Sequence, residues 1–337
     1  MAEPLVRIEG LSVSFDGAPA VRGVDLVVHP GEALGVVGES GSGKSVTWLA
    51  ALRLLPKKAA VEGRVILGGT DLLTVPVPDI ERVRGGRIGM IFQEPSSALN
   101  PVLSIRRQMS EVLALHRGLS GASIKAEARR LMDLVGIPDP EGRLASYPHE
   151  MSGGQNQRVM IAMALAGQPD LLIADEPTTA LDVTIQAQIL DLLQLIRREL
   201  GMAMVLISHD LGVVAENCDR VAVMYAGRIV ETGPAADLFA HPRHPYARGL
   251  IDALPTLQDA RRLVAIPGVV PDPRAMPRGC AFGPRCAHAA PVCLSDVPAL
   301  RAVTPGRRLA CARPGLDLRP TAAAAAPTPA RIRETVQ

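Results

Sequence analysis

One stretch of this 337-residue chain combines glycines, a lysine and a serine in a spacing suited to phosphate. It reads Gly38-Glu-Ser-Gly-Ser-Gly-Lys-Ser45 and fits the pattern G-x-x-x-x-G-K-[ST]. Glycines let successive backbone N–H groups turn toward phosphate oxygens. The apolar run Leu34–Val37 precedes the stretch and the helix-compatible run Val46–Leu55 follows it. The order strand, loop, helix therefore predicts a nucleotide site in which Lys44 binds the β- and γ-phosphates and Ser45 binds Mg²⁺.

Two adjacent carboxylates, Asp175 and Glu176, end an apolar run farther along the chain. A strand emerging beside the phosphate loop would place Asp175 near the magnesium, held through water. Glu176 would lie near the γ-phosphate, where it can orient and polarise the attacking water. Successive side chains on a strand point to opposite faces, so a turn must re-aim Glu176. By itself the pair also fits a strand end with solvated acids; its place after Lys44 favours hydrolysis.

Four of the five cysteines gather near the C-terminus, at Cys280, Cys286, Cys293 and Cys311. Four thiolates can hold a tetrahedral Zn²⁺ or an iron–sulfur cluster, and reduced free thiols are a third possibility. The intervals match neither the C-x2-C of zinc fingers nor the tight spacing of ferredoxins, so chemistry alone leaves the three open. His288 could replace a ligand, but we expect it to face solvent. Cys218 is expected to be a small core residue.

The amino-acid composition limits the kinds of molecule that this chain is expected to bind. The chain has 36 Lys and Arg against 34 Asp and Glu, and only 2% aromatic residues. Neither a basic face nor stacking platforms are therefore expected, and we predict no nucleic-acid partner. No signal peptide is expected at the N-terminus, and no apolar run approaches the ~18 residues of a membrane span.

The pattern of apolar runs divides the chain into three regions. Residues 1–240 alternate strand-like and helical patterns, which predicts an α/β layer fold with a largely parallel sheet. Within them, about 97–160 has helical spacing at 105–116 and 123–135 and predicts an inserted helical subdomain. Residues 241–318 are Pro-rich and irregular and hold the cysteines. Residues 319–337 read as a disordered tail. There is no internal repeat, so we expect one nucleotide-binding unit per chain.

A family resemblance rests on Ser152-Gly-Gly-Gln155 together with the two stretches above, in this order. Ser152–Gln155 looks like the signature of the ABC-type ATPases. Gln93 resembles that family's Q-loop glutamine, and Asp182 in Ala180-Leu-Asp182 resembles its D-loop. His209 resembles the switch histidine that contacts the γ-phosphate. The resemblance implies a P-loop NTPase (ABC ATPase) core with an inserted helical subdomain and a small irregular cysteine-containing C-terminal region.

The motifs and the resemblance together imply the site residues. Phe15 stands where the family places an aromatic ring against adenine, although a core position in an early strand fits equally well. The catalytic residues implied are Glu176, His209 and Gln93, and the magnesium ligands are Ser45, Gln93 and Asp175. The ATP-contacting set is Gly38, Ser40, Gly41, Ser42, Gly43, Lys44, Ser45, Val46, Phe15, Ser152, Gly153, Gly154, Gln155 and Asp182.

The resemblance also implies a dimer. In the family, the signature lies on the helical insert and closes over ATP bound to the partner chain, so that two ATP molecules join two subunits. Met151 stands where the family usually has leucine, and Asn156 where a charged or longer residue is commoner. Neither departure removes a donor that catalysis needs, so we expect both a complete hydrolysing site and a complete signature.

Three further stretches are similar to the dipeptide/oligopeptide/nickel importer ATPases: Gln93–Pro101, Asp175–Gln186 and His241–Leu250. That branch implies two membrane permease subunits, a second ATPase subunit and, indirectly, a substrate-binding protein, with this chain peripheral on the cytoplasmic face of the membrane. Gly279–Cys286 resembles the C-terminal segment in which the branch's cysteines bind a [4Fe-4S] cluster. A nickel or other-solute importer is one alternative. A soluble ABC ATPase of translation or DNA repair is another, disfavoured because those carry two ATPase units or a long coiled-coil insert.

Overall fold

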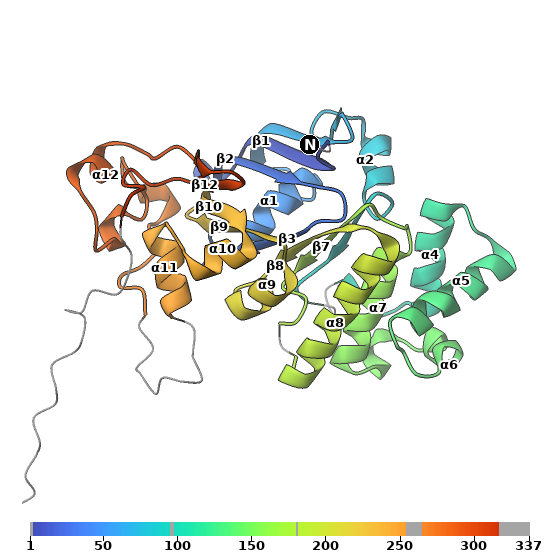
Figure 1. Ribbon diagram of the computed structural model, residues 1–337. Helices are drawn as coiled ribbons and strands as arrows, with labels where there is room; N and C mark the ends of the chain where they lie inside the picture. Colours follow the sequence, from blue (N-terminus) through green and yellow to red (C-terminus); the bar gives the residue numbers. More distant parts are fainter. Residues whose placement is uncertain (1–2, 95–97, 180, 254–264, 317–337) are drawn as a thin grey trace, which may run out of the picture.

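The computed structural model describes residues 3–94, 98–179, 181–253 and 265–316 (Figure 1). The predicted disordered tail, 319–337, lies outside them. The strands are β1 (Val6–Phe15), β2 (Ala18–Val28), β3 (Ala33–Val37), β4 (Ala59–Leu67), β5 (Thr70–Asp71), β6 (Ile88–Ile91), β7 (Leu171–Asp175), β8 (Ala203–Ile207), β9 (Arg220–Tyr225), β10 (Arg228–Pro234), β11 (Arg301–Thr304) and β12 (Arg307–Leu309). The helices are α1 (Lys44–Ala51), α2 (Val77–Val83), α4 (Ile105–Arg117), α5 (Gly121–Leu134), α6 (Pro140–Ala145), α7 (Gly153–Leu165), α8 (Val183–Leu200), α9 (Leu211–Asn217), α10 (Ala235–Ala240), α11 (Pro245–Asp252) and α12 (Pro291–Ser295).

Two sheets organise these elements. The larger has the strand order β11-β12-β10-β9-β3-β8-β7-β6. From β9 through β3, β8 and β7 to β6 the neighbours run parallel, whereas β9, β10, β12 and β11 pair antiparallel. The smaller sheet, β2-β1-β4-β5, is antiparallel. The predicted α/β class with a largely parallel central sheet is confirmed.

The central strands are buried on both faces, which is why their sequences are apolar throughout. Leu34 and Val36 of β3 pack on the side of α1 and the antiparallel sheet, where Trp48 of α1 is fully buried. Ala33 and Val37 point to the opposite face and join the core formed with α7, α8 and α9. Figure 1 shows these layers, with α1 between β1 and β3 and with α7–α9 on the far side of the sheet.

Helices occupy the segment predicted to be helical. The patterns at 105–116 and 123–135 correspond to α4 and α5. Ser104 begins α4 because its side chain accepts the N–H of Arg107, and Gly118 ends it at a φ of 61°. In Figure 1, α4, α5 and α6 form a group at one end of the molecule, away from the small sheet. The exact subdomain bounds stay a prediction. Among the described residues, no helix is both long and apolar enough to cross a bilayer.

The C-terminal segment shares the central sheet with the core. β12 pairs with β10 through Glu231 opposite Leu309 and Thr232 opposite Arg308, and β11 continues the edge. The sequence indicated only an irregular region here, because strands of three and four residues rich in arginine carry no clear apolar alternation. The cysteine-containing segment is therefore bonded to the sheet that carries the candidate site.

Candidate functional site

The predicted site residues follow four neighbouring parallel strands at the same edge of the sheet. Gly38 comes directly after β3, and Asp175 is the last residue of β7. His209 lies two residues after β8, and Gln93 two residues after β6. Because the carboxyl ends of adjacent parallel strands meet at one edge, residues distant in sequence converge there. Open α/β sheets bind their ligands at such edges.

The loop 38–45 requires glycine where the backbone passes close to other backbone. A Cβ at Gly38 would lie 2.2 Å from the carbonyl oxygen of Met224. At Gly43, where φ is 98°, a Cβ would lie 2.8 Å from the carbonyl oxygen of Ala20. The loop is thereby pressed against β9 and β2 before α1 begins at Lys44. Such a loop at the start of a helix presents N–H groups to an anion.

Lys44 and Ser45 face the carboxylates that end β7. The Ser45 hydroxyl donates to Asp175 Oδ1 at 2.8 Å. Lys44 Nζ lies folded over its own loop and donates to the carbonyl oxygens of Gly38, at 2.8 Å, and Glu39, at 3.1 Å. Burial lowers the pKa of Lys44, and the charges of Glu176 and Asp175 act in the opposite sense. Burial raises the pKa of Asp175, while the hydrogen bond from Ser45 opposes it. The pair Ser45 and Asp175 offers two oxygen ligands of the type Mg²⁺ prefers.

Glu176 is re-aimed by the backbone, as its position after a strand requires. Its φ is 48°, in the left-handed region that non-glycine residues rarely adopt. Its Oε2 accepts from Gln93 Nε2 at 3.1 Å and from the Thr179 hydroxyl at 2.9 Å. His209 Nδ1 lies 3.4 Å from the same oxygen. The structure thus brings Glu176, Gln93 and His209 together beside Lys44 and Asp175.

The remaining predicted residues lie elsewhere. Ser152 is exposed and begins α7, where its side chain accepts the N–H of Gln155. A Cβ at Gly153 would meet nothing within 4 Å, so this helix start has open space before it. Asp182 is exposed and begins α8, while Ala180 beside it lies outside the described residues. Phe15 ends β1, partly buried against the core around α1, so its two interpretations both stay open.

The four C-terminal cysteines line one cavity, together with residues that include His244, Phe282 and His288: Cys280, Cys286, Cys293 and Cys311. Burial raises the pKa of the Cys280, Cys286 and Cys311 thiols, and the neighbouring thiols of the set add to the rise. Among the described residues, no three His, Cys, Asp or Glu side chains are arranged to hold a metal ion. His288, expected to face solvent, is half-buried.

Two contacts at the site were not predicted from the sequence. Thr179 fixes Glu176, although its place in the run Pro177-Thr-Thr179 gave no chemical signal. Gln157, which is 2% exposed, donates to the carbonyl oxygen of Pro177 at 2.6 Å. Because Gln157 follows the Ser152–Gln155 stretch on α7, this bond ties that helix to the loop behind Glu176.

The arrangement can perform one kind of chemistry. A helix-start loop with a buried lysine suits a polyphosphate, and Ser45 with Asp175 suits its divalent cation. Glu176 accepts hydrogen bonds at Oε2, and within the described part of the chain no group donates to its Oε1, which can therefore face a water molecule. A carboxylate in that position can orient and polarise water for attack on phosphorus.

Comparison with known families identifies matching regions of the chain. The family model described as ABC transporter matches residues 21–179. The model described as oligopeptide/dipeptide transporter, C-terminal region, matches residues 230–293.

Relatives and solved structures agree with these matches. A protein of Brucella melitensis biotype 1, provisionally named as a peptide import ATP-binding protein, is 51% identical over 91% of this chain and 94% of its own. A protein of Brucella abortus with the same provisional name is 50% identical over 92% and 97%. An ATP-binding cassette solved as a dimer in a post-hydrolysis state with ADP and Pi has a TM-score of 0.61 at 27% identity, over 68% of this chain and 98% of that one. A subunit of an ABC transporter complex from Clostridium perfringens has a TM-score of 0.62 at 29% identity, over 71% and 92%.

Proposed function

This chain belongs to the ATP-binding subunits of ABC transporters, in the oligopeptide/dipeptide branch, and from that membership we propose that it powers the import of di- and oligopeptides. ATP hydrolysis coupled to transport follows from the family. The observation that carries the assignment of individual residues is the convergence of Gln93, Thr179 and His209 on Glu176, next to the pair Ser45 and Asp175.

In the proposed reaction, loop 38–45 and Lys44 bind the phosphates, and Ser45, Asp175 and Gln93 serve the magnesium. Glu176 orients the attacking water, and His209 contacts the γ-phosphate. Lys44 must leave the carbonyl oxygens of its own loop to reach the nucleotide. The hydrogen bond between Ser45 and Asp175 would likewise open for the cation.

A dimer would complete the site. Ser152 and Gly153 are exposed at the start of α7, and a Cβ at Gly153 would meet nothing within 4 Å. With Gly154 they form a helix start that suits phosphate binding on a partner chain. The relative solved with ADP and Pi is itself a dimer. We therefore propose that ATP closes two ATPase subunits over two nucleotides and that hydrolysis releases them.

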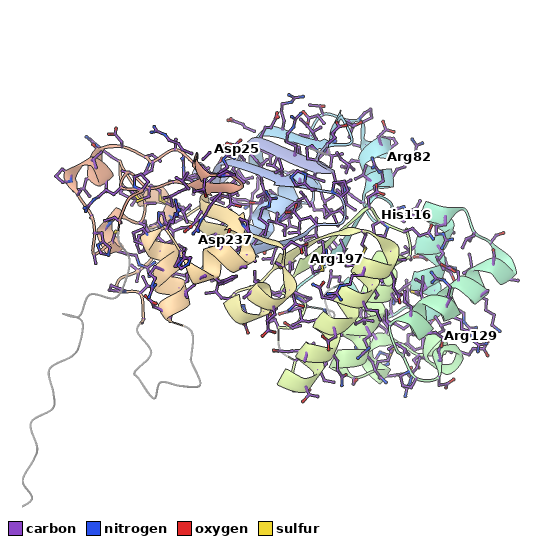
Figure 2. All side chains as sticks on the ribbon, in the orientation of Figure 1. Asp25, Arg82, His116, Arg129, Arg197 and Asp237 are labelled. Carbon is purple, nitrogen blue, oxygen red and sulfur yellow. The ribbon has the colours of Figure 1, made fainter. Side chains whose placement is uncertain are left out.

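A groove between the core and the helical segment offers a place for the permease. Its volume is about 290 Å³, and apolar side chains that include Leu54, Phe92 and Val112 line it. Leu54 and Phe92 are 40% and 37% exposed. Figure 2 shows His116 on α4, next to the segment that follows α2. Gly85 belongs to that segment, and a Cβ at Gly85 would lie 2.9 Å from the His116 ring. Because the groove adjoins Gln93, a permease segment seated in it would sense the hydrolysis site.

The proposed assembly contains two permease subunits, a second ATPase subunit and, indirectly, an extracytoplasmic peptide-binding protein. The chain would lie peripherally on the cytoplasmic face of the membrane. The match of residues 230–293 to the transporter C-terminal region supports this assembly over an ABC ATPase of translation or DNA repair.

Affinity purification of the tagged chain from detergent-solubilised membranes tests the assembly. We expect two polytopic membrane proteins and a second ATPase to accompany it. In proteoliposomes made from this complex, peptide uptake should require ATP and should fail with Glu176→Gln. Recovery of ribosomes or repair factors would contradict import, and ATP-driven nickel uptake without peptide uptake would contradict the proposed solute.

We further propose that the four clustered cysteines hold a [4Fe-4S] cluster with a structural role. Each iron of such a cluster takes a separate thiolate, so the sulfurs need to surround a space, and the cavity lined by Cys280, Cys286, Cys293 and Cys311 meets that need. When bound, the cluster would link segments of a region with little apolar core.

Metal analysis of anaerobically purified protein tests this cluster. We expect about four irons and matching sulfide per chain. Cys293→Ser should lower the iron content, whereas Cys218→Ser, outside the cavity, should leave it unchanged. One zinc per chain, or a metal-free chain with intact ATP binding, would contradict the cluster.

A further inference from the structure

The second residue of the phosphate loop, Glu39, is held by residues from the C-terminal part of the chain. Arg285 makes a bidentate contact with its carboxylate, with Nη1 to Oε2 at 2.7 Å and Nη2 to Oε1 at 3.0 Å. The backbone N–H of Glu39 donates to the Tyr246 hydroxyl at 2.8 Å. Lys44 Nζ contacts the Glu39 carbonyl oxygen at 3.1 Å. Neither Arg285 nor Tyr246 belongs to the predicted nucleotide-binding set, yet both touch the loop that forms it.

Arg285 is itself fixed in place. Its side chain is 5% exposed, against 28% for that of Glu39. Its Nε donates to the Pro267 carbonyl oxygen at 2.9 Å, and its Nη1 donates to the Tyr225 hydroxyl at 3.3 Å. The guanidinium carbon lies 5.7 Å from the centre of the Tyr225 ring and 5.9 Å from that of Phe282. A guanidinium held by so many partners loses little further freedom when it binds a carboxylate.

A carboxylate in a phosphate-binding loop needs a counter-charge. Triphosphate carries several negative charges, and an unpaired Glu39 beside them would repel the ligand. A bidentate arginine neutralises the carboxylate and fixes its orientation at the same time. The Tyr246 hydroxyl adds a third constraint, because it takes up the one N–H of Glu39 and thereby sets the plane of the peptide that begins the loop.

We propose that Arg285, assisted by Tyr246, is a positioning residue for ATP: it neutralises Glu39 and holds the start of the phosphate loop in its binding shape. The proposal rests on the assignment of loop 38–45 as the ATP site. It makes the C-terminal segment a functional part of that site. Arg285 lies in a tight turn in which Gly283 donates to the Cys280 carbonyl oxygen and Cys286 donates to that of Gly283. Two of the clustered cysteines therefore flank the residue that reaches the loop.

Equilibrium binding of a non-hydrolysable ATP analogue with Mg²⁺ tests the proposal on the full-length chain. We expect Arg285→Gln to raise Kd about tenfold, since it leaves a charged group without its partner. The double variant Glu39→Gln with Arg285→Gln should recover a large part of that loss, because no unpaired charge remains. In ATPase assays of Arg285→Gln, KM should rise more than kcat falls, and Arg285→Lys should rescue part of the effect.

A matched control separates this role from general anchoring of the C-terminal segment. Arg307 is also buried, at 6% exposed, and it donates to Glu231, Asp237 and His241 rather than to Glu39. Arg307→Gln should leave Kd unchanged under conditions in which the chain is folded. An equal rise in Kd for Arg307→Gln and Arg285→Gln, or a double variant no better than Arg285→Gln, would overturn the proposal.

Two more variants keep the test decisive. Tyr246→Phe deletes one oxygen at a fully buried ring and should raise Kd about threefold; it serves if Arg285→Gln does not fold. Unchanged Kd in the folded variants would refute the inference. Lys44→Ala, measured alongside, reports on the site itself. If Lys44→Ala binds like the wild type, the assignment of the loop is wrong; if only Lys44→Ala loses binding, the role of Arg285 alone is wrong.

Discussion

His209 Nδ1 lies 3.4 Å from Glu176 Oε2, and this contact joins the ends of two adjacent parallel strands, β8 and β7. Gln93, from the end of β6, donates to the same oxygen. Thr179 approaches it from the turn that follows β7. One carboxylate oxygen is thus held from three strand ends at once. In the proposed mechanism, the other oxygen of Glu176 orients the water that attacks ATP.

Glu176→Gln should abolish turnover and keep ATP binding, because the amide preserves the shape of the side chain but cannot take up a proton. We expect kcat to fall at least about 10²-fold, as for the loss of a general base. The dimer held by ATP should then accumulate, which size-exclusion chromatography with ATP can detect. Glu199→Gln, on the exposed end of α8, is the matched control. Normal hydrolysis by Glu176→Gln would contradict the assignment of the base.

Lys44→Ala should weaken nucleotide binding. The lysine is buried and its ammonium already lies against the loop that would hold the phosphates. Loss of hydrogen bonds to a charged ligand costs about 1.5–3 kcal/mol, which corresponds to roughly 10- to 150-fold in Kd. Titration calorimetry with Mg²⁺ and ATP measures this. Lys58→Ala, at a side chain 70% exposed, should bind as the wild type does. If Lys44→Ala binds ATP as tightly as Lys58→Ala does, the assignment of loop 38–45 as the phosphate site is wrong.

The central layers were predictable because their signals are local. Leu171–Asp175 and Ala203–Ile207 are continuous apolar runs, and such runs suit strands buried on both faces. The expected helix at 46–55 ends early, at Ala51, because Arg53 adopts a φ of 53° and Pro56 follows. The edge strands β11 and β12 were missed, since Arg307–Leu309 gains its strand structure from pairing with the distant β10, and Arg301–Thr304 pairs in turn with Arg307–Leu309.

The residues of the candidate site could also be predicted only where their sequence signals are local. Lys44, Asp175 and Glu176 could be named from residue types at fixed spacing. Tyr246 could not, although its stretch matched the importer branch, because its contact with Glu39 spans 207 positions of sequence. Arg285 likewise acquires a role only through the fold. Ion pairs between distant segments leave no periodic trace in sequence.

Cys218 should resist alkylation in the folded protein. Burial raises the pKa of this thiol to about 12, and the thiolate is the reactive form. At pH 8 the thiolate fraction is then about 10⁻⁴, roughly 10³-fold below that of an ordinary exposed cysteine. The rate should rise about tenfold per pH unit while the fold persists. Mass spectrometry of iodoacetamide-treated protein measures the alkylation rate of Cys218 at pH 8, in the native state and in urea. Native and unfolded rates within tenfold of each other would contradict the burial of Cys218.

Arg307→Gln should destabilise the fold through a buried carboxylate. Glu231 is fully buried, and Arg307 Nη2 contacts its Oε1 at 2.6 Å. The backbone N–H groups of Arg243 and His244 also donate to Glu231, but they supply no full charge. Removal of one member of a buried ion pair costs about 3–5 kcal/mol. Urea unfolding should therefore show a lower midpoint for Arg307→Gln than for Arg308→Gln, a change at the exposed neighbour.

The double variant Arg307→Gln with Glu231→Gln distinguishes the cause of that loss. Because no unpaired charge remains and the amide oxygen at position 231 still accepts the N–H groups of Arg243 and His244, it should recover a large part of the midpoint that Arg307→Gln loses. If the double variant is instead as unstable as the single one, β12 depends on the ion pair itself for its attachment to β10.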